Sequence, residues 1–189
     1  GDSPLNSADH ATDISGTVGA WLSWVDIHRG YQGPYLDQVV RSALVLQALT
    51  YRPTGAIVAA STTSLPEEVG GEANWDYRFG WLRDASWTMN ALWVAACPDE
   101  ASRYFDWIAT SAGSAVHGQL PIMFGVGGER DLTEHQLTHL RGYRDSRPVR
   151  VGNDAWKQKQ LDVFGEVLDS AWVLREQLTG MHPATAAFL

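Results

Sequence analysis

The chain has 189 residues, of which 44% are apolar and 19% are charged, a balance typical of a globular domain rather than a disordered chain. Its net charge of −8 argues against a nucleic-acid partner, because phosphate backbones are bound by basic surfaces. The single cysteine, Cys97, excludes an internal disulfide framework, and no apolar run reaches the ~18 residues that a membrane span needs.

The N-terminal part begins with a polar lead-in. Residues 1–13 are predicted to be disordered or to act as a linker, and a short amphipathic helix follows around residues 21–25. We place the boundary after residue 20, so that residues 1–20 are lead-in and residues 21–189 form the main domain. The first thirty residues lack a basic segment followed by an apolar one, which predicts a cytoplasmic protein. A processed or truncated start would give the same pattern.

The middle of the chain shows helical spacing interrupted by loops. Residues 37–50 form a predicted helix with Asp37 as its N-cap or first-turn acid, and residues 56–61 form a short strand or extended segment. Residues 64–71 form a long loop. Two further helices are predicted over residues 84–97, where Pro98 stops the first, and from Asp99 or Glu100 to about Gly113.

The C-terminal part contains a short apolar segment over residues 120–126 and an irregular excursion, rich in charge, Gly and His, over residues 129–152. A last long helix, capped by Asn153 or Asp154, is predicted to continue to about Leu178. No βαβ repeat and no phosphate-binding Gly-rich loop occurs, which predicts an all-α domain with long loops on one side and no cofactor.

The stretch over residues 74–87 is the most unusual part of the chain. It reads NWDYRFGWLRDASW and contains three Trp, a Tyr, a Phe, two Arg and two Asp. Sugar-binding clefts combine these residue types, because aromatic faces cover pyranose rings while Asp and Arg hydrogen-bond the hydroxyls. Adjacent Arg83 and Asp84 suit paired contacts to vicinal hydroxyls. A buried Arg–Asp pair beneath an aromatic cluster explains the composition equally well.

Other candidates for chemistry carry weaker signals. His135 and His139 are four apart, but their context is not His-Glu-x-x-His, so a zinc protease is not indicated and no metal is expected. Cys97 is predicted to be a small buried hydrophobe, because no His lies near it in sequence. Glu166 lies beside apolar positions, where burial could raise its pKa and make it an acid; pairing with Arg or Lys is the alternative.

Residues 74–85 of this stretch closely resemble the signature of glycoside hydrolase family 15, the glucoamylase-like enzymes. Three further segments resemble the family's bacterial members: PTGAIVAA at 53–60, TSLPE at 63–67 and QLDVFGE at 160–166. The segment IMFGVGGERDLTE at 122–134 resembles actinobacterial members, some of which are α,α-trehalases. The resemblance implies an (α/α)6 toroid and inverting attack on an α-glucosidic bond at a non-reducing end. By motif match, the residues that bind the glucosyl unit are Arg83, Asp84, Trp81, Tyr77 and Trp156.

The resemblance also implies that the chain corresponds to about the first half of a catalytic domain. An inverting glycosidase needs two carboxylates, and the family's acid follows a Trp-Glu motif that does not occur here. The acid and base are expected beyond Leu189, and Glu166 is the one candidate within the chain. Expected partners are a glucose-containing oligosaccharide or disaccharide, the remainder of the catalytic domain, and a second copy of the chain.

Three functions stay open at this point. The first is exo-acting hydrolysis of α-glucans or their oligosaccharides, for which this chain supplies the glucosyl-binding half of the site. The alternative is hydrolysis of α,α-trehalose by the same family. The third is a non-catalytic helical module that binds carbohydrate or folds only with a partner. The choice of α-glucoside depends on loops and subsites that lie largely outside this sequence.

Overall fold

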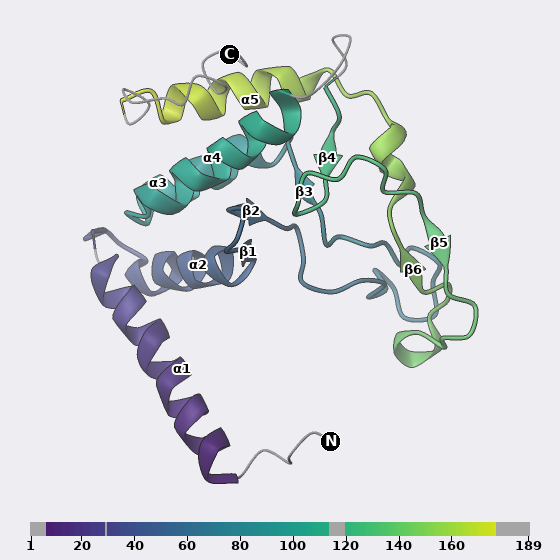
Figure 1. Cartoon of the computed structure of the whole chain (residues 1–189), viewed down its shortest axis with the longest axis horizontal. Coiled ribbons are helices and arrows are strands. Elements are labelled where there is room, and N and C mark those ends of the chain that lie inside the picture. The colour runs from purple at the N-terminus through teal and green to yellow at the C-terminus, as the bar shows by residue number, and fades with distance from the viewer. Residues whose placement is uncertain (1–6, 29, 114–119, 177–189) are drawn as a thin grey trace.

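The computed structural model describes residues 7–28, 30–113 and 120–176, and within these ranges the chain is rich in helix (Figure 1). The helices are α1 Ser7–Ile27, α2 Leu36–Ala48, α3 Ala85–Val94, α4 Pro98–Gly113 and α5 Asp162–Val173. Three antiparallel pairs join short strands: β1 Thr50–Tyr51 with β2 Ala56–Ile57, β3 Gly80–Trp81 with β4 Met123–Phe124, and β5 His135–Gln136 with β6 Arg150–Val151. The predicted predominance of helices is therefore confirmed.

Helix α3 is the centre of the helical side of the molecule. It packs against α2, α4 and α5, while the loops that carry β5 and β6 form a separate lobe on the opposite side (Figure 1). Helix α4 begins at Pro98, whose missing N–H costs nothing at a first helical position, and Asp99 and Glu100 complement the helix dipole in its first turn. Its buried face includes Tyr104, Phe105 and Ile108.

The pairing of β3 with β4 fixes the position of the unusual aromatic stretch. Gly80 lies opposite Phe124, and Trp81 lies opposite Met123. A Cβ atom added at Gly80 would lie 2.3 Å from the ring of Trp107, so only glycine lets the strand approach this buried side chain so closely. The fully buried side chains that surround the pairing include Tyr104, Phe105, Phe124, Leu82, Met89 and Ile122.

Two parts of the fold differ from the sequence prediction. Helix α1 begins at Ser7, so the helix expected around residues 21–25 is longer, and disorder is wrong for residues 7–13. The predicted last helix is divided into a 3-10 helix, Asp154–Lys157, and α5. Between them Gln158 is extended, because the polar run that follows Trp156 offers no apolar face to hold it in a helix. Residues after Glu176 lie outside the described residues.

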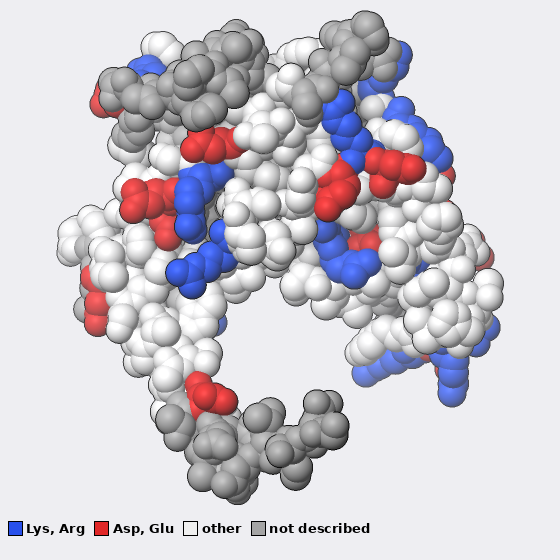
Figure 2. Space-filling model, viewed as in Figure 1, with Lys and Arg blue, Asp and Glu red and all other residues white. Residues whose placement is uncertain are grey.

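The described helices include none that is long and apolar enough to span a membrane. On the face drawn in Figure 2, acidic and basic side chains mostly lie next to one another. The net charge of −8 is therefore not gathered there into one acidic field.

Candidate functional site

Arg83 and Asp84 lie where β3 gives way to α3. Asp84 is the N-cap residue of α3, yet its side chain makes no capping hydrogen bond and is 58% exposed. The Arg83 guanidinium lies 3.7 Å from the Asp84 carboxylate, and its Nη1 donates to Gln160 Oε1 at 3.3 Å. Both charged groups therefore face solvent, with free hydrogen-bonding capacity, at the positive end of a helix dipole.

The ring of Trp81 contacts the Arg83 side chain of the Arg83–Asp84 pair. The Trp81 side chain is buried by the β3–β4 pairing, and the Arg83 guanidinium lies 5.1 Å from the centre of its ring. The indole Nε1 of Trp81 is buried and has no hydrogen-bond partner among the described residues. The indole supports the guanidinium from one side, so the charged end of Arg83 is held close to Asp84.

Glu166 lies beside the same helix end. Its carboxylate accepts a hydrogen bond from Ser86 Oγ, which joins α5 to the first turn of α3. A shallow hollow of about 240 Å³ lies here, lined by Ser86, Trp87, Asn90, Gly165, Glu166 and Asp169. Among the described residues, the side-chain partner of Glu166 is the Ser86 hydroxyl, and no Arg or Lys pairs with its carboxylate. Its role as an acid stays a prediction.

Tyr77 and Trp156 are the other two predicted sugar-binding residues. Tyr77 is 36% exposed, and partial burial, followed by the charge of Glu67, raises the pKa of its phenol. Trp156 belongs to the 3-10 helix and packs partly against the core. Within the described part of the chain, no hydrogen bond or ring contact links either residue to Arg83 or Asp84. Their predicted roles in the glucosyl pocket stay predictions.

A larger open hollow, of about 550 Å³, lies elsewhere on the loops. It is lined by Leu49, Arg78, Phe79, Glu129, Leu132 and neighbouring side chains. None of the five predicted sugar-binding residues lines it. We therefore place the candidate site at the α3 N-terminus, where the predicted charges are.

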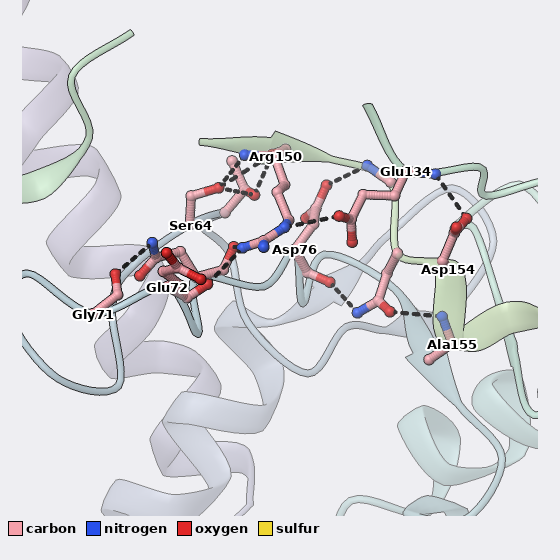
Figure 3. A network of polar contacts seen from close by, with 12 residues as sticks. Ser64, Gly71, Glu72, Asp76, Glu134, Arg150, Asp154 and Ala155 are labelled. Atoms are coloured by element: carbon pink, nitrogen blue, oxygen red, sulfur yellow. Dashed lines mark hydrogen bonds and ion pairs between the residues drawn. The ribbon is translucent and has the colours of Figure 1, made fainter. Parts of the chain in front are cut away.

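The first half of the aromatic stretch is fastened by a buried polar network centred on Arg150 (Figure 3). The Arg150 Nε donates to Glu134 Oε1 at 2.8 Å, and its Nη1 donates to the carbonyls of Glu72 and Asn74 at 2.8 and 3.1 Å. Its guanidinium also lies 4.5 Å from the centre of the Trp75 ring. Arg150 thus ties residues 72–75 to the β5–β6 lobe.

Asp76 forms a second centre in this network. It is fully buried, and its carboxylate accepts from Arg78 Nε at 2.9 Å and Nη2 at 2.8 Å, in a bidentate pair. Its Oδ2 also accepts from the Gly152 N–H at 3.1 Å, and its carbonyl accepts from Asn153 Nδ2 at 3.0 Å. The carboxylate of Asp76 is thereby satisfied by the protein itself and offers little to a ligand.

Comparison with known proteins decides the family. The family model of glycosyl hydrolases family 15 matches residues 33–186, which is most of the chain. The chain belongs to glycosyl hydrolase family 15. The trehalase of Mycolicibacterium smegmatis is 44% identical over 181 residues, covering 93% of this chain and 27% of the relative. The trehalase of Mycobacterium tuberculosis is 44% identical over 173 residues, covering 90% and 25%.

More distant family 15 relatives carry the same name. The trehalase of Thermoplasma volcanium is 39% identical over 153 residues, covering 80% of this chain and 24% of its own length. The chain therefore spans about a quarter of the length of the curated relatives that it matches. No solved structure matches this chain.

The structure of this family 15 chain gives each of the two Arg–Asp pairs in the 74–87 stretch a different place. Asp76 is fully buried and pairs with Arg78, whose own side chain is 42% exposed, whereas both partners of the Arg83–Asp84 pair reach solvent, at 43% and 58% exposure. Sequence analysis did not identify Arg150 or Glu134 as partners of this stretch. The only available signal was Arg150 itself, a charged residue between two valines.

Three other candidates for reactive side chains are Cys97, His135 and His139. Cys97 is buried as predicted, and burial, with a smaller contribution from Glu100, raises the pKa of its thiol to about 12. A thiol with that pKa holds its proton at neutral pH and is not a nucleophile, unless a bound cation displaces the proton. His135 and His139 are both exposed, which is the ordinary state of solvated histidines.

Proposed function

We propose that this chain supplies the glucosyl-binding half of a family 15 site that hydrolyses α,α-trehalose with inversion. The observation that carries the proposal is the exposed Arg83–Asp84 pair above the Trp81 ring, at the N-terminus of α3. The relatives named trehalase favour trehalose over the α-glucans that the sequence placed first.

The chemistry of the pair suits a glucosyl unit. An ionised Asp84 accepts hydrogen bonds from two hydroxyls, and Arg83 donates to a neighbouring one, each charge-assisted bond contributing roughly 1.5–3 kcal/mol. The dipole of α3 favours the ionised form of Asp84. Bonds that tighten as the ring flattens towards the oxocarbenium-like transition state raise the turnover rate as well as the affinity. In the proposed complex, Tyr77 and Trp156 complete the pocket around the sugar.

The proposal requires further chain for the rest of the site. The acid and the base of an inverting glycosidase stand roughly 6.5–9.5 Å apart, and we propose that both belong to the part of the relatives' length that this chain does not cover. Apolar side chains on the outer faces of the described helices support this requirement: Trp87 is 76% exposed and Trp172 is 64% exposed. We propose that further helices of an (α/α)6 toroid cover them.

The test is a graft in which this chain replaces the matched segment of the Mycolicibacterium smegmatis trehalase. We expect the graft to release glucose from trehalose, and the isolated chain to release none from trehalose, maltose or isomaltose. A folded graft without activity on trehalose would contradict the proposal. Sustained turnover by the isolated chain would also contradict it, and would make Glu166 the leading candidate for the acid.

A further inference from the structure

Three side chains with metal-binding atoms meet where α1 approaches the corner between α3 and α4. His28 follows the end of α1, Cys97 directly precedes α4, and Glu100 lies in the first turn of α4. One ligand atom from each lies within 4.8 Å of the other two. Cys97 and Glu100 are buried and His28 is half-buried, so the cluster is part of the interior and not a chance gathering on the surface.

The Glu100 carboxylate is only partly satisfied by the protein. Its Oε1 accepts a hydrogen bond from Trp24 Nε1 at 3.1 Å. Glu100 is only 8% exposed, and its Oε2 is buried without a hydrogen-bond partner among the described residues. Leaving a charged oxygen buried without a donor is costly, so a further positive group is expected at this oxygen.

The orientation of His28 directs its second nitrogen towards that oxygen. Nδ1 lies 2.7 Å from the carbonyl of Trp24, and because a carbonyl only accepts, Nδ1 carries the proton. Nε2 then faces Glu100 Oε2 at 3.6 Å. The Trp24 ring, whose centre lies 4.3 Å from that of the imidazole, helps to hold this orientation. Ligating histidines in metal sites use the same arrangement, donating from the other nitrogen to a carbonyl.

The distance between His28 Nε2 and Glu100 Oε2 helps to decide whether a proton or a metal ion lies between them. A protonated imidazole would make a charge-assisted hydrogen bond to the carboxylate at about 2.7–2.9 Å. Two ligands of one tetrahedral zinc ion lie roughly 3.3–3.8 Å apart, given bond lengths of about 2.0–2.3 Å. The observed 3.6 Å between His28 Nε2 and Glu100 Oε2 lies in the second range, and the Cys97 sulfur, within 4.8 Å of both atoms, would move closer on binding.

We propose that His28, Cys97 and Glu100 bind a zinc-type divalent cation that fastens the end of α1 to α4. One sulfur, one nitrogen and one oxygen donor suit zinc, whereas magnesium and calcium prefer oxygen alone. A water molecule takes the fourth position. Much of α1 is exposed, including Ile14 at 66% and Leu22 at 61%, so few contacts hold the helix against the core. A metal ion at its C-terminal end would add a link between α1 and α4. This site is independent of the proposed sugar site.

The experiment titrates the chelator-treated 189-residue chain with zinc and, separately, with cobalt. We expect one zinc ion per chain and a rise in melting temperature on binding. The cobalt form should show the ultraviolet charge-transfer band of a thiolate ligand. Cys97→Ala and Glu100→Gln should each weaken zinc binding by more than about 100-fold, the upper end of what outer-shell changes produce. His139→Gln, at an exposed histidine, is the matched control and should bind as the parent does.

Three results would overturn the proposal. They are the absence of zinc binding at micromolar concentrations, zinc binding that survives Cys97→Ala unchanged, and a cobalt complex without the thiolate band. The cobalt spectrum uses the unaltered chain, so it decides the question even if the variants fail to fold.

Discussion

The two halves of the 74–87 stretch use the same residue types in opposite ways. In the first half, the Asp76 carboxylate is fully buried and bonded by Arg78 and the Gly152 N–H. In the second half, the Asp84 carboxylate is 58% exposed, and its one ion pair among the described residues is with Arg83, at 3.7 Å. The first half fixes the loop to the rest of the fold, and the second half exposes its charged side chains to solvent.

The difference shows how a loop can hold charged groups in place for a ligand. Exposed charges on a loop are mobile unless the backbone beneath them is fixed. Here the fixing is done by Arg150 on one side and by the β3–β4 pairing on the other. The proposed sugar binding therefore also depends on Arg150 and on the β3–β4 pairing, which do not contact the sugar themselves but hold the binding groups in place.

The largest expected effect is at Arg150. Arg150→Ala removes the guanidinium that donates hydrogen bonds to the Glu134 carboxylate and to the carbonyls of Glu72 and Asn74. These three acceptors then lose that donor. Breaking a buried pair in this way costs about 3–5 kcal/mol. We expect the free energy of unfolding, measured with urea, to fall by that amount. Arg147→Ala, at an exposed neighbour, is the control; an equal effect of the two variants would show that Arg150 does not fix the loop.

A smaller effect is expected at the junction of the two halves. Gly80→Ala places a methyl group against the buried Trp107 ring, and overpacking of this kind costs about 1–3 kcal/mol. Gly165→Ala in α5 meets nothing within 4 Å and should stabilise the helix by roughly 0.5–1 kcal/mol. Thermal melts of the two variants should shift in opposite directions. A neutral Gly80→Ala would mean that Trp107 can move aside.

The smallest effect is expected for a third Arg–Asp pair, on the surface of the loop lobe. Arg141 donates to the Asp145 carboxylate at 2.7 and 2.9 Å and lowers its pKa. A lowered folded-state pKa adds stability above the ordinary value of 3.8, which is lost as the pH falls below it. Because both groups are exposed, Arg141→Ala should leave the melting temperature at neutral pH within error. A clear drop at pH 7 that vanishes in acid would show that exposure does not weaken the pair.

Sequence analysis predicted the elements that depend on local signals. Asp99 and Glu100 predicted the start of α4 to within two residues, although Pro98, interpreted as the stop of the helix before it, is the first residue of α4. The helical spacing after Asp84 predicted α3. The motif predicted that Arg83 and Asp84 bind the glucosyl unit; the structure shows both side chains exposed, and their role stays a prediction. The contacts of Arg150 could not be predicted, because Arg150 meets Asn74 across 76 positions and only folding brings them together. The division of the last helix was missed, because tertiary packing decides whether a polar run stays helical.

The central claim is that Asp84 serves the substrate while Asp76 serves the fold. It is tested most directly by making Asp84→Asn and Asp76→Asn separately in the trehalase graft. For each variant, kcat/KM for trehalose and the melting temperature are measured on one preparation. We expect Asp84→Asn to lower kcat/KM on the order of 100-fold with an unchanged melting temperature. We expect Asp76→Asn to lower the melting temperature while the folded fraction stays active. A melting temperature lowered by Asp84→Asn, with activity retained, would contradict the account.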